Sequence, residues 1–343
     1  MFPRAAGTAR KGPDMTAGSM DRREFLKRSL GAAAAVSAAS AASASAPASA
    51  SAFSYDAKGL PTAVLGRTGV AVPRLGVGLG SRFCAVADED GAQAILRAAL
   101  DQGFYYWDTA SSYRNGSIFS EERIGRVLAD RRREVFLATK CEARTYDAVL
   151  REFAESLKRL RTSYIDVYQV HLIQSLLDVE AIGMADGALK ALRRLKEERA
   201  VRFIGFTGHL SAEAMAEAAR RYDFDTMLIA LNHYAERQGD MEKDAVGAAA
   251  DKGLGISVIK VIRPRETTAG FSAAELIRYA LSVPRVHSAM IGTDSLDVVR
   301  ANAGVLRSFR PMDGPERAAL AGRLRPFFAG RNLPWMDPEY RDA

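Results

Sequence analysis

Four polar residues of this chain stand at or near the ends of strand-like runs, and their side chains suit acid–base chemistry on a carbonyl group. Asp108 and Tyr113 lie in the segment DTASSY, Lys140 closes VFLATK, and His171 closes IDVYQVH. A tyrosine titrates near pH ~10 in water, so it needs a cation beside it to act as a general acid or base near neutrality. Lys140 can supply that positive charge, Asp108 can hold the ammonium in place, and His171 can hydrogen-bond the same substrate oxygen.

The elements that must position these side chains alternate regularly along the chain. Helical patterns such as Asp147–Leu160 and Ser211–Tyr222 separate eight apolar, strand-like runs. Buried-type strands alternating with helices predict an α/β fold, a (β/α)8 or TIM barrel, in which chemistry takes place at the C-terminal ends of the strands. All four polar residues lie there. The expected strands are Arg74–Leu79, Phe104–Trp107, Val135–Thr139, Ile165–Val170, Val201–Phe206, Thr226–Leu231, Gly255–Val261 and Ser288–Ile291.

A β-hairpin is expected before the first of these strands, because TAVLGRTGVAV has Gly66 and Gly69 bounding a turn. The set of Asp, Tyr, Lys and His resembles the tetrad of the aldo/keto reductases, in the order and with the spacing of that family. The resemblance extends from LGRTG in the hairpin to GTDSLDVVRAN near the end of the chain. It implies that the N-terminal hairpin closes the floor of the barrel.

The same resemblance implies a function. It predicts reversible, NAD(P)H-dependent reduction of an aldehyde or ketone to an alcohol, with a small-molecule carbonyl substrate and Tyr113 as the general acid. Two other interpretations remain open. One is an aldolase that forms a Schiff base through Lys140, since such lysines also occur on barrels. The other is a nicotinamide-nucleotide-binding redox sensor with little turnover.

The cofactor is expected to be NADP, with NAD as the alternative. The chain has no GxGxxG turn after a first strand and no P-loop, so the resemblance places the cofactor on the later strands and the helix after the last one. Asp294 stands where the family often has an arginine that meets the adenosine 2′-phosphate, and we expect it to weaken the preference for NADPH. The implied cofactor-binding residues are Thr207, Asn232, Lys260, Gly292, Thr293 and Asn302.

Neither the histidines nor the cysteines predict a metal centre. His209, His233 and His287 share no metal-ligand spacing, and two cysteines cannot build an iron–sulfur cluster. Cys84 and Cys141 are expected as free thiols, although a disulfide is conceivable in an oxidising compartment.

The N-terminal segment belongs to a different class of sequence. Residues 21–27 read DRREFLK and are followed by a stretch rich in Ala and Ser, which resembles a twin-arginine (Tat) translocation signal. We therefore expect residues 1–55 to be signal and linker, residues 56–343 to be the enzyme domain, and the Tat machinery to deliver the protein to the periplasm. The stretch is too poor in Leu, Ile and Phe for a convincing transmembrane helix, so no stable membrane insertion of the mature form is expected.

The positive charge of the chain gives no reason to expect nucleic-acid binding. Residues 1–45 hold seven Lys and Arg against three acids, a net of +4, which leaves +3 of the total +7 for the rest of the chain. A charge that small does not predict a basic binding surface.

Overall fold

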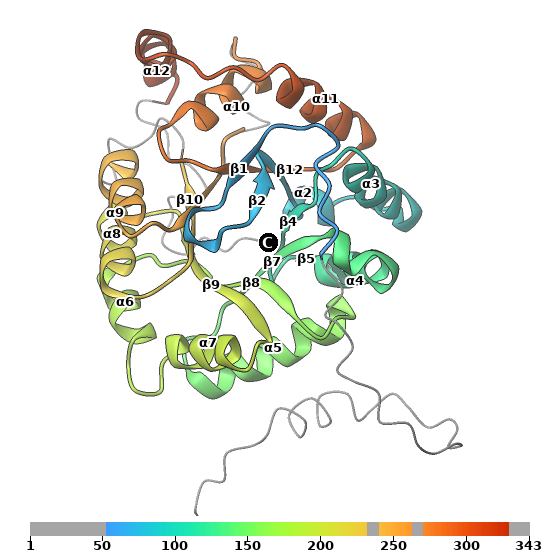
Figure 1. Cartoon of the computed structure of the whole chain (residues 1–343), viewed down its shortest axis with the longest axis vertical. Helices are drawn as coiled ribbons and strands as arrows, with labels where there is room; N and C mark the ends of the chain where they lie inside the picture. The colour runs from blue at the N-terminus through green and yellow to red at the C-terminus, as the bar shows by residue number, and fades with distance from the viewer. Residues whose placement is uncertain (1–52, 232–239, 263–269, 329–343) are drawn as a thin grey trace, which may run out of the picture. The chain divides into compact units, whose positions relative to one another are not determined.

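Eight parallel strands close into a barrel, and helices surround it (Figure 1). The computed structural model describes residues 53–231, 240–262 and 270–328. The chain divides into two units, Met1–Ser45 and Ala46–Ala343, and every described residue belongs to the second. The predicted (β/α)8 barrel is therefore confirmed.

The barrel strands follow one another in chain order, and β12 pairs with β3 to close the ring. Most residues of these strands are buried, because one face of each strand lines the barrel interior and the other is covered by helices. The predicted ranges agree with the structure to within two residues at each end, and for β8 they are identical. The strands are β3 (Leu75–Gly78), β4 (Tyr106–Asp108), β7 (Phe136–Cys141), β8 (Ile165–Val170), β9 (Val201–Gly208), β10 (Thr226–Ala230), β11 (Gly255–Ile259) and β12 (Ser288–Gly292).

The helices cover the barrel with apolar stripes. In α5, for example, Val149, Phe153, Leu157 and Leu160 are buried, which is the spacing of one helix face. Phe153 contacts Tyr168 of β8, with ring centroids 5.0 Å apart. The helices are α2 (Ser81–Cys84), α3 (Glu89–Asp101), α4 (Ser120–Arg131), α5 (Tyr146–Leu160), α6 (Leu176–Ile182), α7 (Ala188–Glu197), α8 (Ala212–Arg221), α9 (Gly247–Asp251), α10 (Ala273–Ser282), α11 (Leu296–Arg307) and α12 (Gly314–Phe328).

The predicted N-terminal hairpin lies at the barrel floor. Strands β1 (Thr62–Val64) and β2 (Ala71–Pro73) pair in antiparallel fashion. Gly66 in their turn has a φ of 47°, and a Cβ there would lie 2.4 Å from backbone atoms at the start of β11. Glycine is therefore required both for the turn and for the close approach.

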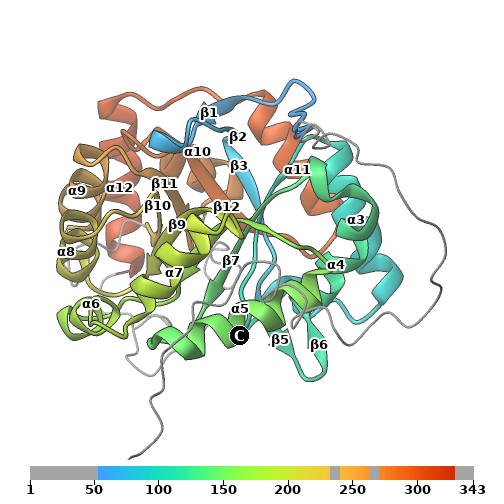
Figure 2. The same cartoon turned by 60° about the horizontal axis from the view of Figure 1, so that its bottom comes forward.

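A second hairpin lies at the opposite end of the barrel (Figure 2). It consists of β5 (Arg114–Asn115) and β6 (Ile118–Phe119), which directly follow Tyr113 in the chain. Two residues per strand are too few for a periodic sequence signal, so this hairpin was not predicted. The backbone N–H of Ser120, at the start of α4, donates to the carbonyl oxygen of Tyr113 at 3.0 Å. The hairpin and α4 together hold the tyrosine at the barrel mouth.

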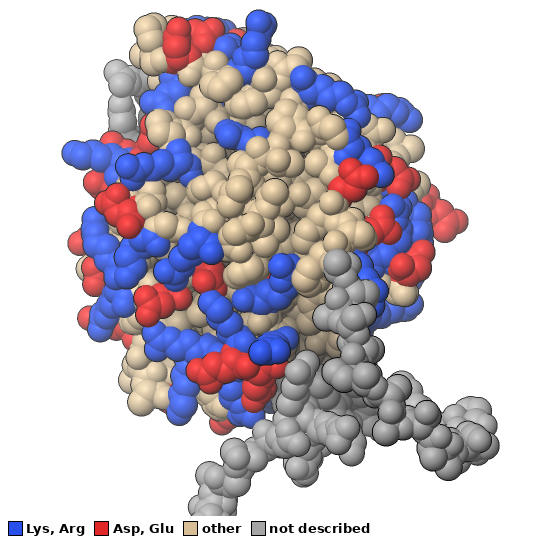
Figure 3. Space-filling model, viewed as in Figure 1, with Lys and Arg blue, Asp and Glu red and all other residues tan. Residues whose placement is uncertain are grey.

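Most charged side chains on the face that carries the N-terminal hairpin lie away from its centre (Figure 3). Basic and acidic side chains are interspersed around a largely uncharged centre there (Figure 3). Among the described helices, none combines the length and apolar character needed to cross a membrane.

Candidate active site

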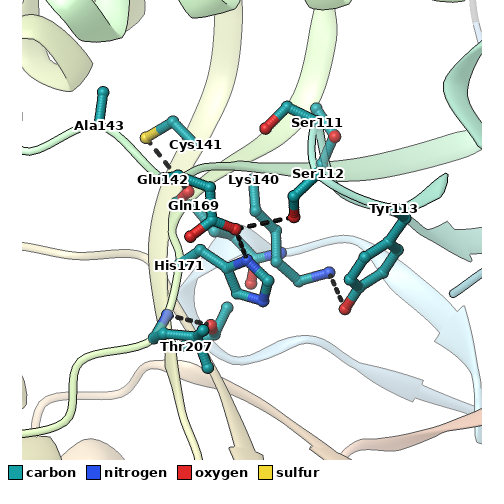
Figure 4. Close-up of polar contacts among 12 residues, drawn as sticks. Ser111, Ser112, Tyr113, Lys140, Cys141, Glu142, Ala143, Gln169, His171 and Thr207 are labelled. Atoms are coloured by element: carbon teal, nitrogen blue, oxygen red, sulfur yellow. Dashed lines mark hydrogen bonds and ion pairs between the residues drawn. The ribbon is translucent and has the colours of Figure 1, made fainter. Parts of the chain in front are cut away.

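All four residues of the predicted tetrad meet at the C-terminal end of the barrel. Asp108 ends β4, Lys140 lies in β7, His171 directly follows β8, and Tyr113 lies in the loop after β4. Their exposed fractions are 7% for Tyr113, 4% for Asp108 and 1% for each of the other two. Elements far apart in the sequence thus bring one acid, one phenol, one ammonium and one imidazole to a single buried place. Figure 4 shows the phenol of Tyr113, the ammonium of Lys140 and the imidazole of His171.

The ammonium of Lys140 is held by three oxygen atoms. Its Nζ donates to Oδ2 of Asp108 at 2.7 Å and to the carbonyl oxygen of Thr109 at 2.6 Å. The third contact, at 3.3 Å, is with the hydroxyl of Tyr113. An ammonium has three donors, so this arrangement uses all of them and fixes the positive charge beside the phenol.

Asp108 is held in turn by Gln169, a residue that the sequence reasoning missed. The Gln169 Nε2 donates to Oδ1 of Asp108 at 3.3 Å. Burial raises the pKa of Asp108 above its usual value, and the charge and hydrogen bond of Lys140 act against that rise. Gln169 lies two residues before His171, and alternate residues of a strand share one face, which was the available signal.

Tyr113 is fixed by packing as well as by its backbone. Its ring meets the ring of His171 nearly edge-on, with centroids 5.8 Å apart and an interplanar angle of 74°. A Cβ on Gly80 would lie 3.3 Å from the Tyr113 ring, so a glycine leaves room for it. A phenol beside an ammonium can give up its proton, because the ammonium stabilises the phenolate that forms.

Glu142 is a second site residue that the sequence reasoning missed. It directly follows β7, and its carboxylate oxygen Oε1 hydrogen-bonds Nδ1 of His171. The Ser112 hydroxyl donates to the same oxygen at 2.8 Å. Its place two residues after Lys140, beside a strand end, was the only sequence signal.

Four of the residues expected to bind cofactor lie at or next to the ends of β9, β11 and β12, and a fifth lies in a helix. Thr207 lies in β9 and is buried, and its hydroxyl oxygen accepts a hydrogen bond from the backbone N–H of Leu172 at 3.0 Å. Lys260 follows β11 with a φ of 61°, Gly292 ends β12 with Thr293 next to it, and Asn302 lies in α11. Asn232 falls outside the described residues.

Asp294 does not present an isolated negative charge. Arg82 of α2 donates from Nε to Oδ2 of Asp294 at 2.8 Å, and its Nη2 binds the same oxygen. The side chain of Arg82 passes over Gly292, where an added Cβ would lie 3.1 Å from its Cδ. The sequence expectation that Asp294 simply repels a phosphate is thus incomplete, because a cation lies beside it.

The remaining candidates behave as structural residues. Cys84 and Cys141 are buried free thiols, as expected, and burial raises the pKa of Cys84 to about 11 and that of Cys141 higher still. Cys84 ends α2 and Cys141 ends β7. Within the described residues no cluster of three or more His, Cys, Asp or Glu could hold a metal ion. His233 lies outside those residues.

Comparisons with known proteins agree with this geometry. The model of the aldo/keto reductase family matches residues 74–264, more than half of the chain. L-galactose dehydrogenase of Arabidopsis thaliana is 36% identical over 157 residues, which are 42% of this chain and 47% of that enzyme. Three curated relatives are matched over only 46% to 63% of their own lengths.

Solved structures show the same fold. The holo form of aldo-keto reductase AKR11C1 from Bacillus halodurans is 23% identical with a TM-score of 0.64, and the match covers 77% of this chain and 96% of that one. An aldo-keto reductase from Klebsiella pneumoniae, solved in complex with NADPH, is 25% identical with a TM-score of 0.59. That match covers 82% of this chain and 96% of the Klebsiella pneumoniae protein.

Proposed function

Because this chain belongs to the aldo/keto reductase family, we propose that it catalyses the reversible NAD(P)H-dependent reduction of an aldehyde or ketone, with Tyr113 as the general acid. The single observation that carries the proposal is the 3.3 Å contact between the Lys140 ammonium and the Tyr113 hydroxyl at the mouth of the barrel. Two of the three ammonium donors bind oxygens of Asp108 and Thr109, and the third meets the phenol, so the positive charge lies beside the hydroxyl that has to release a proton.

Each tetrad residue has a distinct task in this proposal. Tyr113 gives its proton to the carbonyl oxygen as the carbonyl carbon is reduced, and Lys140 stabilises the phenolate that remains. Asp108 keeps the ammonium in place through the 2.7 Å contact. His171 orients the substrate oxygen toward the phenol. In the reverse direction the phenolate takes the proton of an alcohol.

The barrel mouth fits a nicotinamide cofactor. No amino-acid side chain donates a hydride, and a bound nicotinamide supplies it to the carbonyl carbon. Gly78 and Gly292 are register partners at the ends of β3 and β12, so neither presents a side chain where the strands meet the mouth. Next to them, Arg82 and Asp294 offer one positive and one negative charge, and Thr293 offers a hydroxyl group. The NADPH complex of the Klebsiella pneumoniae relative supports NADPH as the cofactor.

The two alternative interpretations are less well supported. A Schiff-base lysine must attack as the free amine, whereas the Lys140 nitrogen is buried and donates to Asp108, Thr109 and Tyr113. A sensor without turnover needs only a nucleotide site and gives no reason for a phenol, an ammonium and an imidazole to converge.

We propose polyhydroxylated aldehydes, such as aldoses, as the first substrate class to test. The Glu142 carboxylate is 37% exposed at the mouth, where it can accept hydrogen bonds from substrate hydroxyls and would repel a carboxylate substrate. The partial match to L-galactose dehydrogenase supports the same class.

A direct test combines cofactor binding with a substrate panel. Fluorescence titration with NADPH and NADH measures cofactor affinity, and a panel of aldoses, other aldehydes and ketones measures reduction. The proposal predicts saturable binding of the cofactor and reduction of at least one class of carbonyl compound. Tight cofactor binding with no reduction across the panel would favour the sensor, and borohydride trapping of Lys140 on a carbonyl would favour the aldolase.

A further inference from the structure

A carboxylate from the outer layer of helices reaches the loops at the barrel mouth. Glu152 lies in the second turn of α5, a helix that a buried apolar stripe fixes on the barrel. Its Oε1 accepts a hydrogen bond from the backbone N–H of Glu142 at 3.0 Å, and its Oε2 accepts one from that of Ala143, also at 3.0 Å. The hydroxyl of Ser111 donates to Oε1 as well. One carboxylate thus binds three donors.

These three donors belong to two different loops. Ser111 lies in the loop after β4, two residues before Tyr113. The two backbone donors lie in the loop after β7, which begins two residues after Lys140. A hydrogen bond to an ionised carboxylate is roughly twice as strong as one between neutral groups. Glu152 therefore joins the chain beside the phenol firmly to the chain beside the ammonium.

Backbone pairing alone holds this part of the loop after β4 less firmly. The N–H of Ser111 donates to the carbonyl oxygen of Lys140 at 3.3 Å. Backbone hydrogen bonds are usually about 2.7 to 3.2 Å long, so this one is weak. The N–H of Tyr113 donates within its own turn, to the carbonyl oxygen of Ala110 at 3.2 Å. The side-chain contact of Ser111 with the carboxylate is therefore the stronger link from this turn to the neighbouring loop.

The next residue of the same turn makes a parallel link. The hydroxyl of Ser112 donates to the carboxylate of Glu142 at 2.8 Å, and Figure 4 shows this contact together with the one between Lys140 and Tyr113. Because the backbone N–H of Glu142 is bound by Glu152, the position of this second link also depends on Glu152. Two successive serines thus connect the loop after β4 to the part of the loop after β7 that Glu152 holds.

We propose that Glu152 is a positioning residue for proton transfer, because it holds the two loops together and so sets the spacing between the Tyr113 hydroxyl and the Lys140 ammonium. These two groups lie 3.3 Å apart. Catalysis depends steeply on such spacing, and a misplacement of about 1 Å lowers a rate by about 10²-fold. Glu152 acts through the loops and does not contact the substrate. This inference rests on the proposed function and adds a residue of α5 to it.

The variant Glu152→Ala removes the carboxylate from both loops. For the reduction of an accepted aldehyde, kcat should fall by about 10²-fold. The KM for the aldehyde and the affinity for NADPH, measured by fluorescence titration, should stay nearly the same. Glu152→Gln keeps the size of the side chain and one acceptor oxygen, so it should restore part of kcat. The matched control is Glu155→Gln, which removes an exposed carboxylate of the same helix and should leave kcat unchanged.

A double-variant cycle shows whether Glu152 acts through the phenol. In a Tyr113→Phe protein there is no proton donor left to position, so adding Glu152→Ala should lower the residual rate little further. If Glu152 served only the general integrity of the fold, the two losses would multiply. Multiplying losses would therefore overturn the proposal, as would a Glu152→Ala protein with the kcat of the wild type.

A further measurement needs no substrate and uses a milder variant. Ser111→Ala removes the link on the side of Tyr113 and leaves Glu152 bound to the loop after β7, so it keeps the test open if Glu152→Ala does not fold. Amide hydrogen exchange of residues 111–113 should become faster in Ser111→Ala than in the wild type, and kcat should fall. Unchanged exchange and unchanged kcat in Ser111→Ala would overturn the proposal. If no carbonyl compound is reduced at all, the proposed function fails, while hydrogen exchange still decides whether Glu152 joins the two loops.

Discussion

Lys140 places its ammonium 3.3 Å from the hydroxyl of Tyr113 and 2.7 Å from a carboxylate oxygen of Asp108. The phenol and the acid therefore share one cation, which is only 1% exposed. This sharing links catalysis to stability, because the same side chain assists the proton donor and neutralises a buried carboxylate.

Replacing Lys140 by Met should impair both properties. The phenolate loses its stabilising cation, so reduction should fall by about 10²-fold or more, in the range of a lost acid catalyst. The buried Asp108 also loses its partner, which should lower the free energy of unfolding by about 3–5 kcal/mol. Urea denaturation and steady-state rates measure the two effects.

A double variant separates them. Adding Asp108→Asn to Lys140→Met removes the uncompensated charge, so most of the stability should return while activity stays low. Recovery of activity together with stability would mean that the cation serves the fold alone.

The Arg82–Asp294 pair should influence cofactor choice. In Asp294→Asn the guanidinium of Arg82 is released from its partner and can meet a 2′-phosphate, so the affinity for NADPH relative to NADH should rise about tenfold, or about 1.4 kcal/mol. Fluorescence titration with both cofactors measures the ratio. Asp297→Asn is the control, because it removes an equal charge from an exposed ion pair with Arg300 nearby. Equal ratios in both variants would show that Asp294 does not face the ribose.

The pH dependence of stability should report on His287. Its Nδ1 accepts a hydrogen bond from the backbone N–H of Ile256 at 2.9 Å, and burial lowers the pKa of His287 below its usual 6.5. As the pH falls, the unfolded chain therefore protonates His287 before the folded chain does. The stability that depends on the neutral, buried ring is complete above the usual pKa and is lost as the pH falls below it. In His287→Asn the amide oxygen can keep the hydrogen bond. Between about pH 7.5 and 5.5 the Tm of the wild type should fall further than that of the variant, and parallel curves would contradict the assignment.

The sequence was sufficient for the barrel because its strands are long apolar runs. Ile165–Val170 was predicted with the observed bounds, since both faces of β8 are buried. The start of β4 was predicted too early. Phe104 instead caps the preceding helix α3, which ends at Asp101, because its N–H donates to the carbonyl oxygen of Ala99 at 2.9 Å. Apolar character alone does not distinguish a capping residue from a strand residue.

The candidate site was predicted only in part, for a similar reason. The tetrad could be recognised because Asp108, Lys140 and His171 lie at the ends of strand-like runs and Tyr113 follows Asp108 by five residues. Glu142 could not, because its direction depends on hydrogen bonds that backbone N–H groups of the loop after β7 donate to the carboxylate of Glu152, ten residues later in the chain. The Arg82–Asp294 pair joins residues 212 positions apart, so no local pattern predicts it.

Export through the Tat pathway remains a proposal, based on the Arg22–Arg23 pair. Nicotinamide cofactors are scarce outside the cytoplasm, and the Tat route carries folded proteins, so we propose that cofactor is bound before translocation. Replacing both arginines by Lys should retain the protein in the cytoplasm, as measured by cell fractionation. The control is Arg4→Lys, outside the DRREFLK segment. Unchanged periplasmic recovery of the double variant would rule out this route.

The most direct test of the account is the rate of carbonyl reduction by Tyr113→Phe. The change removes one oxygen atom, so folding and cofactor affinity should stay nearly the same. Turnover of an accepted aldehyde should fall by about 10²- to 10⁴-fold, or roughly 3 to 5 kcal/mol of activation free energy, because the proton donor is gone. A Tyr113→Phe protein that binds cofactor and reduces the aldehyde at close to the wild-type rate would contradict the assignment of Tyr113 as the general acid.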